Sequence, residues 1–278
     1  MRALLRDQFP DLAGLELVEL DPGWDNAIFR LGSELTVRLP RRAMGAQLVE
    51  HEQRWLPELA PCLPLPVPVP LHRGTPAHGY PWRWSICPWL PGEPALRVAV
   101  DDNADAAHTL GRFVAALAEP APPDAPPNPF RGVPLAQRTD RLDAALDALG
   151  DTVDRVAIRA LWSELVATPP WVGPPLWLHG DLHPGNVLVD HGRISAVIDF
   201  GDLTGGDPAM DLSVAWMQFA PTVRGVFRDA AGGCDDDTWR RARAWALAFG
   251  LACLASSADT PEFAALGRRA VESALRDQ

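Results

Sequence analysis

The stretch that decides the fold of this chain is His179-Gly180-Asp181-Leu182-His183-Pro184-Gly185-Asn186-Val187-Leu188-Val189, followed by Ile198-Asp199-Phe200-Gly201-Asp202. Glycine and proline break the first part into a loop, and the apolar run that follows is typical of a short buried strand. A turn at 190–192 then leads into a second strand, 194–198, which ends at Asp199. Because a hairpin of this length returns the chain toward the loop, we expect Asp181, Asn186 and Asp199 to lie close together.

These three side chains indicate a particular chemistry. Two carboxylates and one amide oxygen are hard ligands that suit Mg²⁺, but they are too few to enclose the ion. Magnesium held by so few protein groups completes its shell with water and with substrate phosphates. The spacing therefore favours phosphoryl transfer.

The rest of the chain predicts an α+β protein with two lobes. Short apolar runs in the first third predict strands at 15–20, 27–31, 35–39, 67–71 and 81–87, with one helix at 43–60 between them. The remainder has the helical period, and we expect helices at 103–119, 138–149, 152–167, 208–219, 235–257 and 261–275. A proline- and glycine-rich segment at 88–92 marks the boundary. We expect a strand-rich lobe at 1–90, a hinge at about 87–92, and a helical lobe at 91–278.

Composition narrows the class of partner. The chain has 278 residues, 47% of them hydrophobic, and a formal net charge of −11. An acidic chain lacks the basic footprint that a phosphate backbone requires, so nucleic acid is not expected as a partner. All 25 basic residues are Arg, which excludes lysine-based catalysis. With no signal peptide and no apolar run long enough to span a bilayer, we expect a cytoplasmic protein without membrane contact.

The two quoted segments resemble the catalytic and metal-binding segments of the aminoglycoside phosphotransferase family. That family has the fold of eukaryotic protein kinases and also includes choline, homoserine and fructosamine kinases. The resemblance implies a small, β-rich nucleotide-binding lobe at 1–90 and a larger helical lobe that carries the catalytic loop and the acceptor site. It also implies Mg²⁺ as cofactor and ATP, with GTP not excluded, as co-substrate.

The resemblance assigns roles to six residues in and near the loop. Asp181 is expected to be the catalytic carboxylate, which orients the acceptor hydroxyl and accepts its proton, while Asn186 and Asp199 hold Mg²⁺ against the nucleotide phosphates. His179 and His183 are expected to support the loop. Asp211 matches the family's aspartate that braces the loop from the next helix.

The nucleotide site is expected in the first lobe, where the chain departs from its family. Arg38 stands on the third strand in place of a lysine that contacts the nucleotide phosphates. Its expected partner on the following helix is Glu52, with Glu50 as the second candidate. Arg keeps the charge but presents a planar fork of donors rather than a point charge. The alternative interpretation of Arg38 is a solvated strand residue on the outer face of the first lobe. Further nucleotide contacts are expected from Gly23 and Asn26 in the nucleotide loop and from Pro88 and Leu90 in the hinge.

We therefore predict a phosphotransferase that moves the γ-phosphate of ATP to a hydroxyl of a small cationic molecule, with an aminoglycoside-type antibiotic as the favoured acceptor. Residues 91–278 hold 26 acidic residues against 16 Arg, which is consistent with a cationic acceptor. One alternative is a metabolic kinase of the same fold that acts on choline, homoserine or a sugar. Another is an inactive nucleotide-binding module, which Arg38 favours and the intact set of Asp181, Asn186 and Asp199 disfavours. The identity of the acceptor, the choice between ATP and GTP, and the oligomeric state stay open.

A protein kinase is disfavoured on two grounds. Gly180 stands where protein kinases carry an arginine in the catalytic loop. The segment between Asp199 and the next helix is also too short for a regulatory activation segment.

Overall fold

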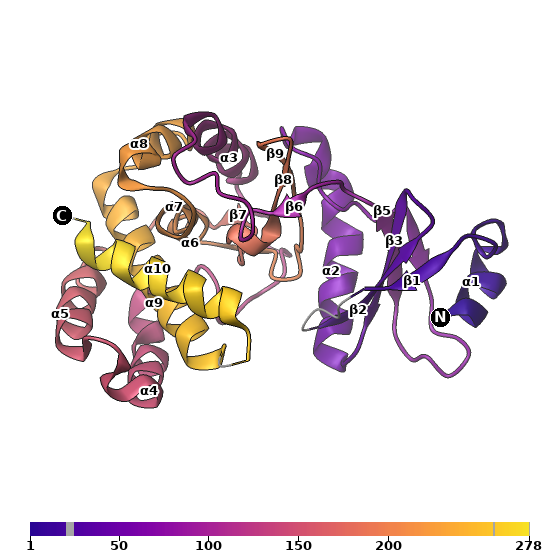
Figure 1. The fold of residues 1–278 in the computed structure, drawn as a ribbon, viewed down its shortest axis with the longest axis horizontal. Coiled ribbons are helices and arrows are strands. Elements are labelled where there is room, and N and C mark those ends of the chain that lie inside the picture. Colours follow the sequence, from indigo (N-terminus) through magenta and orange to yellow (C-terminus); the bar gives the residue numbers. More distant parts are fainter. Residues whose placement is uncertain (21–24, 258, 278) are drawn as a thin grey trace. The chain divides into compact units, whose positions relative to one another are not determined.

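The computed structural model describes residues 1–20, 25–257 and 259–277, and the chain divides into two compact units. Unit 1 comprises Met1–Pro91 and Ser195–Asp202, and unit 2 comprises Gly92–Ile194 and Leu203–Gln278. An antiparallel sheet dominates unit 1 and helices dominate unit 2 (Figure 1), so the expected α+β class is confirmed. Residues 195–202, which the sequence places in the second lobe, cluster with unit 1.

Unit 1 is built on a five-stranded sheet in the order β1-β2-β3-β5-β4 with antiparallel neighbours. Its strands are β1 (Leu17–Glu19), β2 (Asn26–Leu31), β3 (Leu35–Pro40), β4 (His72–Gly74) and β5 (Trp84–Pro88), and its helices are α1 (Arg2–Gln8) and α2 (Ala43–Leu59). Single 3₁₀ turns follow these helices at Pro10–Leu12 and Ala60–Cys62.

The two faces of β3 serve different purposes, because successive side chains of a strand point to opposite faces. Val37 and Leu39 join the buried cluster that also holds Leu4 and Leu5 of α1. Arg38, between them, pairs with a glutamate of α2. The alternation thus places one apolar and one charged layer on the same strand.

One predicted strand is wrong. The segment 67–71 forms no strand, and β4 begins only at His72. Proline occupies positions 64, 66, 68 and 70, and proline has no N–H to donate to a sheet ladder. Leu71 N–H still bonds the Ile86 carbonyl at 2.8 Å, so the segment reaches the sheet only as the prolines end.

Unit 2 contains eight of the described helices: α3 (Ala104–Leu117), α4 (Thr139–Leu149), α5 (Arg155–Val166), α6 (Ala209–Leu212), α7 (Val214–Gln218), α8 (Pro221–Ala230), α9 (Asp236–Ser256) and α10 (Pro261–Arg276). Three of them begin with a side-chain cap: Asn103, Asp154 and Asp235 accept hydrogen bonds from N–H groups in the first turns of α3, α5 and α9. Such caps satisfy N–H groups that have no partner inside the helix. Among the helices of the described residues, none combines the length and the apolar character that crossing a membrane requires.

Two helical predictions need correction. The expected helix 208–219 is divided into α6 and α7, and at the division the Ser213 hydroxyl donates to the Met210 carbonyl at 2.6 Å. A serine side chain that bonds backbone in this way competes with the regular helical pattern. Helix α8 was not predicted, although Pro221 at its first turn is a typical start signal.

Short strands of unit 2 frame the loop that decides the fold. Strand β7 (Leu176–Leu178) pairs with β10 (Thr204–Gly206), and β6 (Glu93–Pro94) pairs with β8 (Val187–Asp190), both antiparallel. The loop 179–186 therefore connects β7 to β8, each of which is paired with another strand. The loop ends in a 3₁₀ turn, Pro184–Asn186. After β8 the chain turns into β9 (Arg193–Val197), whose second half belongs to unit 1.

Candidate active site

Asp211 of α6 fixes the backbone at the start of the loop 179–186. Asp211, which is 2% exposed, accepts hydrogen bonds from the His179 N–H at 2.6 Å and from the Gly180 N–H at 3.0 Å. Gly180 has φ +80, a conformation that glycine adopts without strain. Burial raises the pKa of Asp211, although the bonds from His179 and Gly180 favour its ionised form. One buried carboxylate thus fixes the two residues that precede Asp181.

Asp181 projects from this loop with its side chain 26% exposed. Its Oδ1 lies 2.8 Å from a guanidinium nitrogen of Arg131, and its Oδ2 lies 3.5 Å from His183 Nε2. Burial acts to raise the pKa of Asp181, but the charge of Arg131 and the hydrogen bond from His183 outweigh it and hold that pKa well below its usual range. The carboxylate is therefore ionised at neutral pH, as a proton acceptor must be.

The ring of His183 is fixed on several sides. It packs between Phe249 and Phe263, with ring centroids 5.4 and 5.6 Å away, and its Nδ1 accepts from the Gly185 N–H at 3.0 Å. Since Nδ1 is an acceptor, the neutral ring carries its proton on Nε2, the atom that faces Asp181. The ring is therefore placed to steady the Asp181 carboxylate.

Asn186 closes the loop and is 7% exposed. Its side-chain N–H donates to the Asp181 backbone carbonyl at 2.9 Å, which assigns the amide orientation and leaves the amide oxygen as its acceptor atom. An oriented amide oxygen is a donor that fits Mg²⁺.

Asp199, the second expected metal ligand, belongs to unit 1. It has φ +64, which is uncommon for a residue with a side chain and is often associated with functional positions. Its side chain is 55% exposed, and its Oδ1 accepts from Arg38 at 3.2 Å. A carboxylate that is partly exposed in this way also fits a hard cation that retains water and phosphate.

Arg38 and Glu52 form a buried ion pair in unit 1, with 2.7 Å between the guanidinium nitrogen and the carboxylate oxygen. Arg38 is 8% exposed and Glu52 is 1% exposed. Burial acts to lower the pKa of Arg38, but the charges of Glu52 and Asp199 outweigh it and raise that pKa above its usual value. One guanidinium thus bridges α2 and Asp199, the second residue after β9.

The other expected nucleotide contacts lie in unit 1. Asn26 begins β2 and is 8% exposed, and its side-chain oxygen has no hydrogen-bond partner among the described residues. Pro88 ends β5, and its carbonyl accepts from the Thr36 hydroxyl at 3.3 Å. Leu90 is half-buried beyond it. Gly23 lies outside the described residues.

Arg131 is the residue that sequence reasoning missed. It comes from the proline-rich connector 119–134, in which it is the one basic residue. Because the chain has no lysine, every cationic side chain near the site must be an arginine or a histidine. The one arginine of this connector, followed by glycine, was therefore the sequence feature that could have indicated Arg131 as a site residue.

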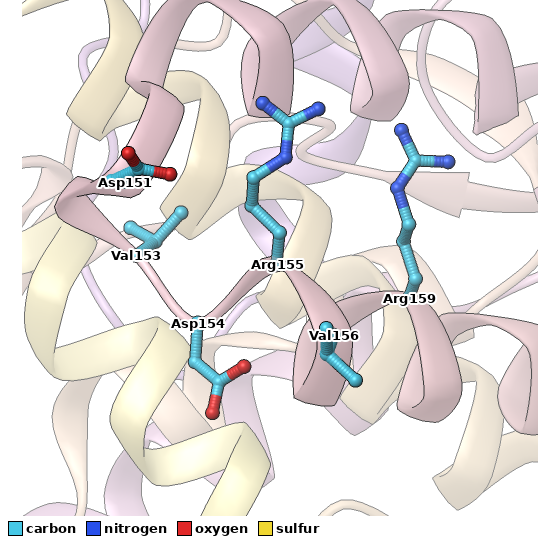
Figure 2. Close-up of a pocket in the computed structure, with 6 residues that line it drawn as sticks. All are labelled: Asp151, Val153, Asp154, Arg155, Val156 and Arg159. Carbon is cyan, nitrogen blue, oxygen red and sulfur yellow. The ribbon is translucent and has the colours of Figure 1, made fainter.

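A surface pocket of about 450 Å³ lies elsewhere in unit 2, at the turn between α4 and α5 (Figure 2). It is lined by Asp151, Val153, Asp154, Arg155, Val156 and Arg159, none of which is an expected site residue. Arg155 donates to Asp147 at 2.6 Å and Arg159 pairs with Asp143 at 2.8 Å. Arg155 and Arg159 of α5 thus form ion pairs with α4, and we assign the pocket no role.

The chain is similar to curated phosphotransferases over part of its length. The chain is 26% identical over 150 residues to an aminoglycoside 3'-phosphotransferase of Escherichia coli, and the match spans 51% of this chain and 55% of that relative. The chain thus spans about half the length of the curated relatives it matches.

Two solved structures are similar over nearly the full length. The GDP and kanamycin complex of APH(2")-IIia superposes with a TM-score of 0.71 at 19% identity and covers 98% of this chain and 97% of that chain. Macrolide 2'-phosphotransferase MphH from Brachybacterium faecium superposes with a TM-score of 0.64 at 25% identity, covering 97% and 98%. The family described as "Phosphotransferase enzyme family" matches residues 16–245. The chain belongs to this phosphotransferase family.

Proposed function

We propose that the protein transfers the γ-phosphate of a nucleoside triphosphate to a hydroxyl of a small antibiotic-type molecule, with an aminoglycoside as the favoured acceptor. The observation that carries this proposal is the Asp181 carboxylate, ionised and held between Arg131 and His183 on a loop whose backbone Asp211 fixes. Family membership supports the same reaction.

In this proposal each side chain of the candidate site has one task. Asp181 orients the acceptor hydroxyl and accepts its proton, and His183 steadies the carboxylate. Asn186 and Asp199 would hold Mg²⁺, which when bound neutralises charge on the nucleotide phosphates. Arg38, anchored by Glu52, supplies the cation for the phosphates in a chain that has no lysine.

The donor and the acceptor are proposed from chemistry and from similarity. ATP is the expected donor, and GTP is included because one similar structure is a GDP complex. The acidic excess of residues 91–278 favours a cationic acceptor. Similarity to a macrolide 2'-phosphotransferase makes macrolides the second acceptor class to test. A cytoplasmic location stays a prediction from the sequence.

The inactive-module alternative is disfavoured by the side chains themselves. Arg38, the departure that favoured it, forms a buried ion pair with Glu52 and also contacts Asp199. The cation is therefore present on β3 although the lysine is not.

A turnover screen tests the proposal. The protein is incubated with Mg²⁺ and either ATP or GTP, together with kanamycin and other aminoglycosides, macrolides, choline, homoserine or sugars, and nucleotide consumption is measured. We expect one acceptor class, the aminoglycosides, to raise consumption well above the acceptor-free rate. If no acceptor does so with either nucleotide, the proposed function is wrong.

The matched variant for the screen is Asp181→Asn. It keeps the shape of the side chain but removes the proton acceptor, so we expect kcat to fall by about 10²–10⁴-fold. Thermal unfolding and nucleotide affinity should stay close to those of the wild type. Full turnover in this variant would remove Asp181 from the mechanism.

A further inference from the structure

Arg131 lies closer to the candidate catalytic carboxylate than His183 does. Its guanidinium nitrogen lies 2.8 Å from Asp181 Oδ1, whereas His183 Nε2 lies 3.5 Å from Oδ2. Opposite charges at this distance attract strongly when the surrounding water is partly excluded. The side chains of Arg131 and Asp181 are 25% and 26% exposed, so water screens this pair only in part.

The fold holds the backbone beside Arg131 in one place. Gly132 has φ +61, and a Cβ at that position would lie 2.5 Å from Leu178 Cδ1 and 3.0 Å from the Gly206 Cα. The Gly132 carbonyl accepts from the Asp207 N–H at 3.0 Å. The connector therefore lies directly on the β7–β10 pair, and only glycine fits there.

Two further contacts secure the same connector. The Asp207 carboxylate is bound by Arg241 at 2.7 and 3.2 Å, and both residues are less than 10% exposed. Upstream of Arg131, the Thr204 hydroxyl donates to the Pro126 carbonyl at 2.7 Å. The backbone that carries Arg131 is therefore held on both sides of this residue, at Pro126 and at Gly132.

A fixed guanidinium matters because a carboxylate turns easily about its terminal bond. The hydroxyl of an acceptor must come within about 2.6–3.2 Å of the carboxylate oxygen that takes its proton. A displacement of about 1 Å is enough to reduce the rate about 100-fold. The ion pair with Arg131 is made at Oδ1, and a carboxylate has about four lone-pair positions on its two oxygens, so positions remain for the acceptor.

We infer that Arg131 is a positioning residue that fixes the Asp181 carboxylate for transfer, an inference that rests on the proposed function. In the transfer step the acceptor oxygen bonds to the γ-phosphorus, the bond from the γ-phosphorus to the bridging oxygen of the nucleoside diphosphate breaks, and the hydroxyl proton passes to Asp181. Arg131 takes no part in these bond changes. It acts by holding the orientation of Asp181 while they occur.

The experiment compares Arg131→Ala with the wild type in steady-state kinetics, using kanamycin and the fastest acceptor of the screen with Mg-ATP. We expect kcat to fall about 10- to 100-fold, while KM for the nucleotide and the unfolding midpoint change little. Arg131→Lys should recover part of kcat because the charge remains. Guanidinium chloride, added to Arg131→Ala far below denaturing concentrations, should also restore activity, and sodium chloride at the same ionic strength should not.

Arg141→Ala is the matched control. Arg141 is an exposed arginine nearby in the chain whose guanidinium lies 4.0 Å from the centre of the Phe130 ring. Its removal changes the net charge by the same amount, so we expect kcat within about twofold of the wild type.

Each outcome separates the inference from the function on which it rests. An active wild type with an equally active Arg131→Ala variant overturns the role of Arg131 and leaves the proposed function standing. A loss of activity that neither lysine nor guanidinium restores, together with a lower unfolding midpoint, shows a structural role and also overturns it. A wild type that transfers phosphate to no acceptor overturns the proposed function, and this inference with it.

Discussion

At the scale of single residues, the environment of Arg38 shows what kind of residue replaces the lysine of the family at this position. The sequence left two interpretations, a cation of the nucleotide site or a solvated residue on the outer face of the sheet. The second is wrong, because Arg38 is 8% exposed and contacts both Glu52 and Asp199. Its role toward the nucleotide stays a prediction.

Arg38→Ala should strongly destabilise the protein. The variant leaves Glu52, which is 1% exposed, without its cation, and breaking a buried pair in this way costs about 3–5 kcal/mol. Denaturant unfolding measures the loss, and Arg38→Lys should recover much of it.

Arg42→Ala is the control for this prediction. Arg42 pairs with Asp25 at 2.7 Å, but the Arg42 side chain is 54% exposed, so we expect a loss of about 1 kcal/mol or less. Equal losses for the two variants would contradict the view that burial makes the Arg38 pair important.

Cysteine reactivity gives a pH-dependent test at the same scale. Burial raises the pKa of Cys253 to about 12, so at pH 8 only ~10⁻⁴ of this thiol is the reactive thiolate. Because the pKa is raised, alkylation of Cys253 by iodoacetamide should quicken about tenfold for each pH unit between 8 and 11. Mass spectrometry of the labelled protein measures the rate, with the exposed Cys62 as reference. Labelling of Cys253 as fast as that of Cys62 at pH 8 would contradict this prediction.

At the scale of elements, α9 and α10 pack together in unit 2 (Figure 1), and their close approach depends on two glycines. A Cβ at Gly250 would lie 2.9 Å from the Gly267 carbonyl oxygen and 2.9 Å from Ala270 Cβ. A Cβ at Gly267 would lie 2.7 Å from the Gly250 carbonyl oxygen. These glycines therefore allow the two helices to pack closely, although glycine disfavours a helix.

Gly250→Ala should destabilise the protein by about 1 kcal/mol or more, because the strain of overpacking exceeds the gain in helix propensity. Gly225→Ala in α8 is the matched control, since nothing lies within 4 Å of a Cβ there and the position is exposed. That variant should be stabilised by about 0.5–1 kcal/mol. Thermal or denaturant unfolding decides, and a stabilised Gly250→Ala variant would show that the helices separate without cost.

At the scale of the whole molecule, binding of the nucleotide should raise the free energy of unfolding. A ligand that binds only the folded state at 100 times its Kd adds about 2.7 kcal/mol, which raises Tm by about 5 °C or more for a chain of this size. We expect Mg-ATP or Mg-GTP to produce this shift and EDTA to reduce it. Asp199→Ala should reduce it as well, since the metal loses a charged ligand. An equal shift in Asp199→Ala, with and without EDTA, would make Asp199 structural.

The sequence by itself determined the features that depend on neighbouring residues. The α+β class, five of the helices of unit 2 and the loop between β7 and β8 all follow from periodicity and from glycine and proline placement, which act over a few residues. The expected strand at 67–71 fails for the same local reason, because alternating prolines outweigh the apolar residues between them.

Only the tertiary structure decided which distant side chains meet. The pairing of Arg131 with Asp181, the support of Gly132 by Asp207 and Arg241, and the assignment of 195–202 to unit 1 leave no local pattern in the sequence. Charged side chains select partners according to how the elements pack, and many pairings of 25 arginines with 36 acidic residues are compatible with one sequence. Burial then decides the strength of each pair, since an ion pair gains or loses most where water is excluded.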